Sequence, residues 1–456
     1  MSATEAPVLL GRLCSSWRAI SLSTPRLWAT LHVCEPSNDP ALLPSFKFQT
    51  KYDQRLEAMT AWLARSGNCP LSISFQSDFV EGTPSSVSFL GAIIPFASRW
   101  QKIQLMSLAP PLVEVLSHLT ENDVPILQSL AVNNMCIQDE LPPSQRWTSV
   151  QILHGRRLSE ISIWSTYNIA AELPVRWNIL TSLTLEDFSL NPPFTSGRAL
   201  EVLSRCPELQ TCRFNIVDWG TGGPVVGSIV ECPSLNSLHL TCSGNPAAIL
   251  RRIFEFLVVA QLKHLGIQGH GNPDSDSDSD TNFPAFHAAS KEFESFSIHS
   301  TVLPRQAFFA VLRSLPPTLR RLELTLSSDF AVSDGVLALL TPSEDAVVSP
   351  FCPASRELVM KHCSSSNDAL MHCIKSRMSA VSYESLEQVK VWFTREMPSD
   401  ILPDLRDLVD AGLRIALYYH PSRARARTQF SPWLGLEVAH PNLPGYLLYQ
   451  PSEPPT

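Results

Sequence analysis

An apolar pattern recurs along most of the chain, in which leucine or another apolar residue takes the first, fourth and sixth places of a short unit. Clear copies are Leu180-Leu183-Leu185, Leu235-Leu238-Leu240 and Leu319-Leu322-Leu324. Thirteen such units begin between about residue 70 and residue 412, on average about 28 residues apart. A recurrence of this length is typical of leucine-rich repeats, in which each unit supplies one strand and a returning helix or loop.

The places between the apolar ones test this interpretation, because side chains alternate between the two faces of a strand. The third, fifth and seventh places are mostly polar, as in Ser182, Thr184 and Glu186. The fourth and sixth places, expected to point inward, are all apolar: Ile73/Phe75, Ile103/Leu105, Leu130/Val132, Ile161/Ile163, Leu183/Leu185, Cys212/Phe214, Leu238/Leu240, Leu265/Ile267, Phe296/Ile298, Leu322/Leu324, Leu358/Met360, Val389/Val391 and Ile415/Leu417. Each unit therefore reads as a strand with one buried face.

Several linking segments carry apolar residues at helical spacing, namely 197–206, 247–260 and 305–315. We therefore predict an α/β leucine-rich-repeat solenoid, or horseshoe, with a parallel concave sheet and short outer helices over residues 70–420. A small helical segment (1–35) and a helical connector (36–69) precede it, and a proline-rich tail (421–456) follows.

A solenoid of this kind presents a long concave face to another macromolecule. The outward places predict these partner-binding residues: Trp164, Glu186, Arg213, His239, Arg321, Glu323, Lys390, Trp392, Arg414 and Tyr418. Because Trp392 and Tyr418 occupy seventh places of consecutive units, they should lie side by side as an anchor, with Lys390 and Arg414 near them; exposed aromatics often dominate binding. In the alternative, the tail with Trp433 and Leu434 folds back over this pair.

Composition limits the kinds of partner. The chain of 456 residues has 35 basic and 43 acidic residues, a net charge of −8, which favours neither nucleic acid nor an anionic membrane surface. No apolar run reaches the roughly 20 residues of a membrane helix, and no secretory signal is visible. Eleven irregularly placed cysteines indicate reduced thiols, so we expect a cytoplasmic or nuclear protein.

A search for catalytic motifs finds no phosphate-binding loop with its lysine, no nucleophile elbow and no metalloprotease helix. His362-Cys363 and His372-Cys373 form the one metal-like cluster, but adjacent side chains on a strand or helix point apart, unlike converging zinc ligands. We expect no enzyme activity, no catalytic residue, no metal and no cofactor.

The segment 269–282 contains four aspartates alternating with serines, and we expect it to be a disordered acidic loop. Acidic residues after Ser275 and Ser277 make these serines candidate phosphorylation sites. A solvated loop with no regulatory role is the simpler interpretation.

The N-terminal segment is the second informative region. Leu9, Leu10, Leu13, Trp17 and Ile20 form one apolar stripe on an expected helix, and Thr24 is expected to cap a short helix beginning at Pro25. Together with Trp28 these residues predict an apolar wedge, in which Trp17 and Trp28 pack around Leu13 and Leu27. The wedge either needs a partner surface or caps the exposed end of the solenoid.

This region resembles the second half of an F-box, on the residues Leu13, Cys14, Trp17, Arg18, Ile20, Pro25, Leu27, Trp28 and Leu31. The whole chain looks like the F-box and leucine-rich-repeat proteins abundant in mushroom-forming fungi, and residues 62–73 look like their entry into the first repeat. The resemblance implies a substrate receptor of a Skp–cullin–F-box ubiquitin ligase, in which Leu13, Trp17, Ile20, Pro25, Leu27 and Trp28 bind the Skp-type adaptor and the repeats bind an unknown target protein.

The leucine- and proline-rich first helix of that family has no counterpart among residues 1–7. Two interpretations stay open: a shortened gene product, or a chain that keeps the repeats without strong adaptor binding. The second would make it a leucine-rich-repeat interaction scaffold with no role in ubiquitination.

Overall fold

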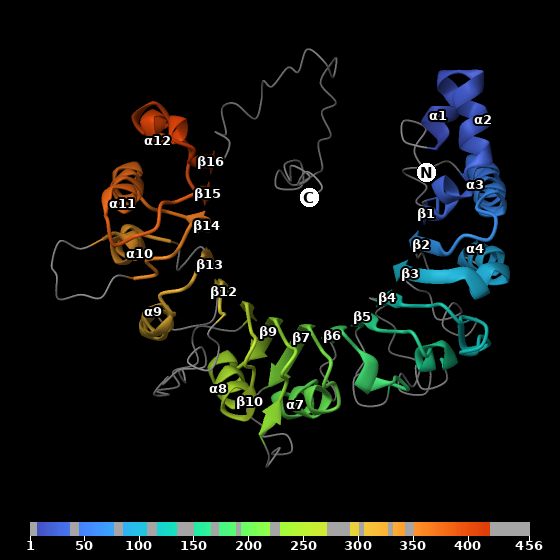
Figure 1. Cartoon of the computed structure of the whole chain (residues 1–456), viewed down its shortest axis with the longest axis horizontal. Helices are drawn as coiled ribbons and strands as arrows, with labels where there is room; N and C mark the ends of the chain where they lie inside the picture. The colour runs from blue at the N-terminus through green and yellow to red at the C-terminus, as the bar shows by residue number, and fades with distance from the viewer. Residues whose placement is uncertain are drawn as a thin grey trace.

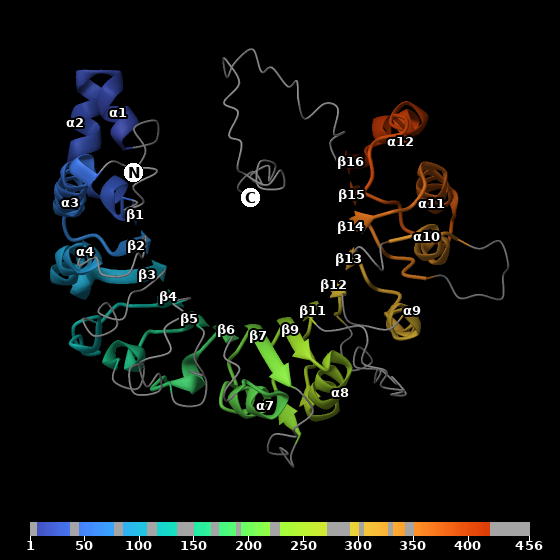
Figure 2. The ribbon, with the colours of Figure 1, turned by 180° about the vertical axis from the view of Figure 1, so that it is seen from behind.

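The strands and helices form an arc with two layers, in which the strands line the inner side and the helices cover the outer side (Figures 1 and 2). The computed structural model describes residues 7–36, 45–76, 85–106, 116–134, 150–165, 173–187, 193–218, 229–270, 292–300, 305–326, 332–342 and 351–419. Within these residues, every strand pairing is parallel.

The inner layer is a single sheet of 14 strands whose spatial order follows the chain. The strands are β1 (Thr30–Cys34), β2 (Leu71–Gln76), β3 (Trp100–Met106), β4 (Ser129–Asn134), β5 (Glu160–Ser165), β6 (Ser182–Asp187), β7 (Thr211–Asp218), β9 (Ser237–Gly244), β11 (His264–His270), β12 (Ser295–Ser300), β13 (Arg321–Leu326), β14 (Glu357–Cys363), β15 (Gln388–Phe393) and β16 (Arg414–Tyr418). A separate two-stranded sheet pairs β8 (Val230–Glu231) with β10 (Leu257–Val258).

The outer layer consists mainly of helices that return the chain from one strand to the next, and α1, α2 and η1 precede the first strand. The α-helices are α1 (Val8–Leu13), α2 (Ser15–Ser23), α3 (Ser45–Arg65), α4 (Ser85–Ile93), α7 (Ser196–Ser204), α8 (Pro246–Phe256), α9 (Arg305–Ser314), α10 (Asp334–Leu340), α11 (Asn367–Ser379) and α12 (Arg406–Asp410). The 3-10 helices are η1 (Pro25–Trp28), η2 (Ile94–Arg99), η3 (Gln151–His154), η4 (Trp177–Ile179) and η7 (Pro403–Leu405).

The core lies between the two layers and is built by the inward residues of the strands. The residues predicted to point inward are buried, except for Ile415 and Leu417 on the last strand, which are partly exposed. In-register pairs such as Leu238–Leu265 and Leu240–Ile267 stack the same row on neighbouring strands. The predicted parallel concave sheet with outer helices is confirmed.

The sheet begins one strand earlier than the predicted start of the repeats at residue 70. Leu31 and Val33 of β1 point into the core and register with Ile73 and Phe75 of β2. Helix α3 lies between these two strands, so the segment predicted as a connector contains the outer helix of a repeat. The repeat pattern was not recognised in this unit because Trp28, rather than leucine, occupies its first place.

The predicted linking helices are present as α7, α8 and α9. Helix α7 begins after Thr195, whose hydroxyl accepts a hydrogen bond from the Arg198 N–H. Helix α8 begins after Asn245, whose side chain accepts from the Ala248 N–H, with Pro246 at the first helical position. It ends at Phe256, short of the predicted residue 260, because Leu257 and Val258 pair with β8.

Two predicted features lie outside the described residues: the candidate phosphorylation sites Ser275 and Ser277 within the acidic segment, and the tail of residues 421–456. In the part of the chain that the structure describes, no helix combines the length and apolar character needed to cross a membrane.

Candidate protein-binding surfaces

The N-terminal end of the arc is a pair of short helices rather than one continuous helix. Cys14 has an extended backbone, with φ −159° and ψ 171°, and separates α1 from α2. Two hydrogen bonds hold the helices together: Arg18 Nε donates to the Gly11 carbonyl (2.7 Å), and the Ser21 hydroxyl donates to the Pro7 carbonyl (3.1 Å). The single stripe predicted from Leu9 to Ile20 is therefore divided between two helices.

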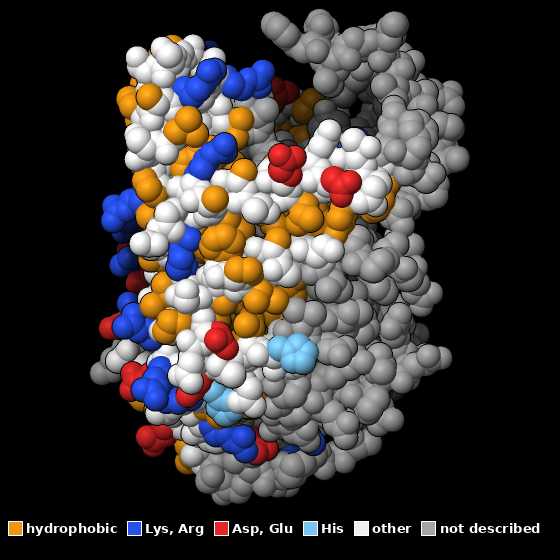
Figure 3. All heavy atoms as spheres, turned by 90° about the vertical axis from the view of Figure 1, so that its right-hand side faces the viewer, with side chains coloured by type: hydrophobic (Ala, Val, Ile, Leu, Met, Phe, Trp, Pro, Cys, Tyr) orange, Lys and Arg blue, Asp and Glu red, His pale blue; other side chains and the backbone are white. Residues whose placement is uncertain are grey.

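This pair of helices leaves large apolar side chains in water. Leu13 is 61% exposed, Trp17 47% and Ile20 51%, and Leu9 and Leu22 are also exposed. We call these five residues the hairpin patch. Figure 3 looks onto this arm of the arc, where hydrophobic side chains lie exposed at the upper end beside basic side chains. Exposed apolar side chains in such a group are typical of a binding surface.

The other half of the predicted wedge belongs to the core. Trp28 is only 4% exposed, and its ring meets the Trp62 ring edge-on at 4.8 Å between centroids. The Arg65 guanidinium lies over it at 4.9 Å, and Trp28 Nε1 donates to the Ser21 carbonyl (2.7 Å). The expectation that Trp17 and Trp28 pack together as an available apolar face is wrong for Trp28, because α3 supplies its partner.

Pro25 and Leu27 follow in the turn and short helix between α2 and β1, with Pro25 exposed and Leu27 half-buried. The turn between α2 and η1 differs from the prediction, since the Thr24 hydroxyl donates to the Ile20 carbonyl (2.7 Å) and does not cap the following helix. Pro25 lies against the Gly67 turn, where a Cβ on the glycine would stand 3.5 Å from the proline. Leu27 is partly buried and packs on the core. Of the predicted adaptor-binding residues, Leu13, Trp17, Ile20 and Pro25 are therefore exposed, whereas Leu27 is half-buried and Trp28 is buried.

At the other end of the arc, Trp392 and Tyr418 form the predicted aromatic pair. They occupy registered positions on β15 and β16, and their rings stack at 4.7 Å with an interplanar angle of 13°. Tyr418 is 41% exposed and Trp392 is half-buried. Trp164 is distant from this pair, since it lies on β5 in the opposite arm of the arc (Figure 1).

The cation that accompanies the aromatic pair is Lys361 of β14, whose Nζ lies 5.7 Å from the centre of the Trp392 ring. Lys390 and Arg414 are on the same two strands as the aromatics, at positions nearer the strand start. Lys361 occupies the seventh place of its unit, one strand before Trp392. Aligning the seventh places of successive units would have identified it.

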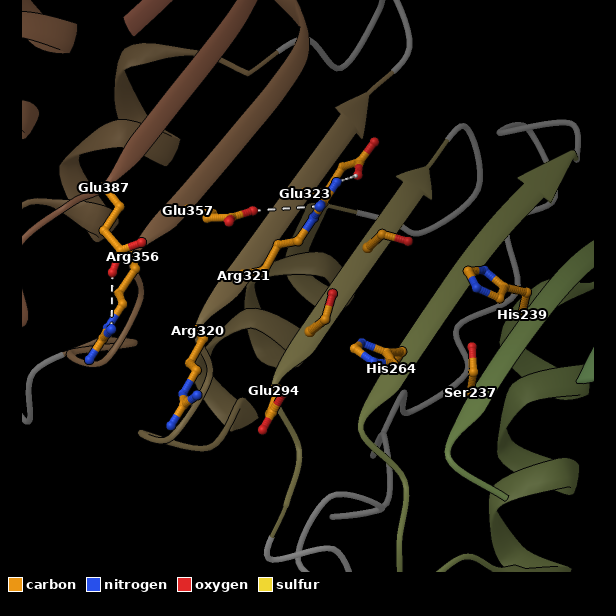
Figure 4. A pocket seen from close by; sticks show the side chains of 12 residues that line it. Ser237, His239, His264, Glu294, Arg320, Arg321, Glu323, Arg356, Glu357 and Glu387 are labelled. Carbon is orange, nitrogen blue, oxygen red and sulfur yellow. Dashed lines mark hydrogen bonds and ion pairs between the residues drawn. The ribbon is translucent and has the colours of Figure 1, made fainter. Parts of the chain in front are cut away.

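Charged residues form two separate groups of ion pairs on the concave face. Arg213 pairs with Glu186 (3.5 Å), and Arg321 lies between Glu323 (3.2 Å) and Glu357 (3.5 Å), as Figure 4 shows. Lys361 adds a second cation to Glu323 at 3.0 Å. Burial raises the pKa of the Glu323 carboxyl, but hydrogen bonds and charges from Lys361 and Arg321 outweigh it, so its pKa is lowered.

A hollow of about 530 Å³ opens on this face across β7 to β14, and its floor depends on Gly266. A Cβ on Gly266 would stand 2.2 Å from His239 Nδ1 and 3.1 Å from Ser297 Oγ. The missing side chain therefore lets the His239 imidazole lie down over β11. Burial, followed by the charges of Arg213 and His264, lowers the pKa of His239, and Glu323 acts in the opposite direction.

His362 enters the wall of this hollow through a strand irregularity. The pairing of β14 with β15 shifts register between Met360 and Cys363, and His362 has φ +54°. Such a bulge allows two consecutive side chains, Lys361 and His362, to line the hollow while Cys363 stays buried. Alternation alone would place His362 inward, so the sequence pattern could not identify it.

The described residues offer little for covalent or metal chemistry. No group of three or more His, Cys, Asp or Glu side chains gathers among them as metal ligands would. Burial raises the pKa of the Cys206 and Cys242 thiols to about 12 and that of Cys232 to about 11, which keeps these thiols protonated and unreactive. The surfaces described here are suited to recognition.

Comparison with protein-family models finds no match to the chain, and comparison with curated proteins finds none either.

Proposed function

We propose that the chain is a protein-interaction module, the substrate receptor of a Skp–cullin–F-box ubiquitin ligase. In this proposal the hairpin patch binds the Skp-type adaptor, and the concave sheet binds the target protein. The observation that carries it is the exposure of Leu13, Trp17 and Ile20 on the helices that resemble an F-box. Leaving these three side chains in water is unfavourable, and a partner surface would remove that cost.

The two proposed binding surfaces lie apart on the arc. The hairpin patch lies at the first end of the arc, and the aromatic pair and the hollow lie toward the other end (Figure 1). A target held on the concave face would leave α1 and α2 accessible. A receptor must bind its adaptor and its target at the same time, and this arrangement meets that requirement.

The adaptor interaction can be measured by biolayer interferometry with a purified Skp-type adaptor. Trp17→Ala should weaken binding by about 2 kcal/mol, roughly 30-fold, as expected for an aromatic residue at the centre of an interface. Val381→Ser is the matched control, because Val381 is a fully exposed apolar residue after α11. Absence of binding by the unsubstituted chain would contradict the adaptor role.

A scaffold without a ligase role is the second candidate function, and the burial of Trp28 against Trp62 favours it. In this alternative the N-terminal segment serves to cover the exposed end of the sheet, as the ends of repeat arrays require. It predicts no adaptor binding, while target binding by the concave face is retained.

A further inference from the structure

The hollow and the aromatic pair are adjacent, and Lys361 belongs to both. Its Nζ is 3.0 Å from Glu323 in the wall of the hollow and 5.7 Å from the Trp392 ring centre. A segment of chain that crosses the strands can therefore reach both features. Ser297, at the bottom of the hollow on β12, is three strands from Trp392 on β15. At about 4.8 Å per strand this separation is about 14 Å, or roughly four to five residues of extended peptide.

The lining of the hollow is rich in hydrogen-bond donors. Histidines, hydroxyls, an amide and two cations line it: His239, His299, His362, Thr241, Ser297, Thr325, Gln268, Arg213 and Lys361. Among the described lining residues, Glu323 is the one carboxylate, and Lys361 and Arg321 already hold it. A group that accepts hydrogen bonds and carries negative charge complements this lining.

The charge balance around the hollow argues against a dianion. Arg213, Arg321 and Lys361 are each paired with a carboxylate of Glu186, Glu323 or Glu357, so three formal positive charges meet three negative ones. No surplus cation remains within this set to neutralise a dianion. A single carboxylate can be bound by neutral hydrogen-bond donors together with the nearby Arg and Lys side chains of these ion pairs.

Two departures from the regular strand pattern build this hollow. Gly266 removes a side chain from its floor, and the bulge at His362 adds a second side chain to its wall. A positive φ in a residue other than glycine costs free energy, and such costs are tolerated where they position a side chain for use. The two departures are on different strands, β11 and β14, and both act on the same space.

We propose that the hollow and the aromatic pair hold one extended segment of the target protein, with an Asp or Glu side chain in the hollow and an apolar side chain on Trp392 and Tyr418, about four to six residues apart. This inference rests on the proposed function only in taking the concave face as the target-binding face. It specifies the chemistry of the target segment.

The test uses a random dodecamer peptide library displayed on phage and selected on the full chain, followed by affinity measurement of the best peptide by fluorescence anisotropy. Selected peptides should carry Asp or Glu about four to six positions from an aromatic or aliphatic residue. Replacing that acid by its amide should weaken binding about tenfold or more, because a charged hydrogen-bond acceptor is lost.

Protein variants locate the binding site. Gly266→Val should weaken the selected peptide about tenfold or more, because its Cβ displaces His239 from the floor. The double change Trp392→Ala/Tyr418→Ala should weaken it at least as much. Ser74→Val is the matched control, since Ser74 is an outward residue on β2 in the opposite arm. Melting temperatures identify any variant that loses its fold, and the acid-to-amide peptide tests the hollow without altering the protein.

Selected peptides without an acidic residue, or with affinity unaffected by Gly266→Val, would overturn the inference. If the aromatic double change still abolished their binding, the concave face would remain the target-binding face. Tighter binding of a phosphoserine peptide than of the carboxylate peptide would overturn the monoanion assignment. An empty selection would overturn the inference too, and the adaptor measurement would then decide the proposed function separately.

Discussion

The two tryptophans of the N-terminal segment have opposite roles, although the sequence presents them as a pair. Trp28 is enclosed by Trp62, Arg65 and the Ser21 carbonyl, whereas Trp17 is about half exposed. The local pattern gives both residues an apolar helical position. Only the distant helix α3, which returns the chain to the sheet, determines which of them is buried.

Substitution by alanine should separate these roles. Trp28→Ala should cost about 3–5 kcal/mol of stability, because it removes a buried aromatic and leaves a cavity. Trp17→Ala should change stability by less than about 1 kcal/mol, since most surface changes are small. Thermal melting of both variants measures the difference, and a large loss of melting temperature for Trp17→Ala would contradict the exposed hairpin patch.

His239 gives the concave face a pH-dependent stability with a defined sign. Its pKa in the folded chain lies below its ordinary value of 6.5, because burial and the charges of Arg213 and His264 disfavour the imidazolium. The unfolded chain therefore binds this proton more readily, and stability falls as the pH drops from 6.5 toward the lowered folded pKa. At pH values well above 6.5 this contribution is constant.

Comparing melting temperatures from about pH 7.5 to about pH 5.5 tests this sign. The unsubstituted chain should lose more stability over this range than His239→Gln, whose amide does not titrate. Gly91→Ala serves as a control for an unrelated change, because a Cβ at Gly91 has no neighbour within 4 Å. Equal slopes for the chain and for His239→Gln would show that the imidazole is not held in the neutral state.

One buried arginine helps to fix α11 to the rest of its repeat. Arg377 is fully buried, and it donates to the carbonyls of Leu340 at the end of α10 (3.0 Å) and of Cys352 (2.8 Å). Its guanidinium also lies 4.7 Å from the centre of the Tyr383 ring. Burial lowers the pKa of Arg377, while nearby Cys373 and Tyr383 oppose this shift. These contacts join α10, α11 and the segment before β14.

Removing this arginine should loosen the unit. Arg377→Ala leaves two buried carbonyls without their donor and opens a cavity, so we expect a loss of about 3 kcal/mol or more. Arg377→Lys should retain only part of the stability that Arg377→Ala loses, because a single ammonium cannot reproduce the planar guanidinium with its several donors. Lys375→Ala, at an exposed position of the same helix, is the control. Melting temperatures that agree among all three variants would contradict this role.

The sequence predicted the regular elements well because each unit repeats the same constraint. An inward row that is apolar and an outward row that is polar specify both the strand and its register. The exceptions come from contacts with other parts of the chain. The first strand was missed because its unit begins with Trp28, and the bulge at His362 depends on keeping both Cys363 and Phe393 buried. The sequence places Gly266 at an outward position of its strand. Its role in forming the floor of the hollow follows only from the position of His239 in the structure.

Over the whole arc, each strand of the 14-stranded sheet pairs only with the strands of the preceding and following units, from β1 to β16. Stability in such an array is close to a sum of units and the interfaces between them. The two ends of the arc should therefore respond independently to substitution or binding. This independence allows the hairpin patch and the concave site to be tested one at a time in the intact chain.

Hydrogen–deuterium exchange of the full chain, with and without a purified Skp-type adaptor, tests whether the hairpin patch is the adaptor-binding surface. We expect slower exchange confined to α1 and α2, with β13 to β16 unchanged, because the adaptor should cover the hairpin patch and leave the concave face to the target. Unchanged exchange throughout the chain, or slower exchange centred on the strands around Trp392 and Tyr418, would contradict it.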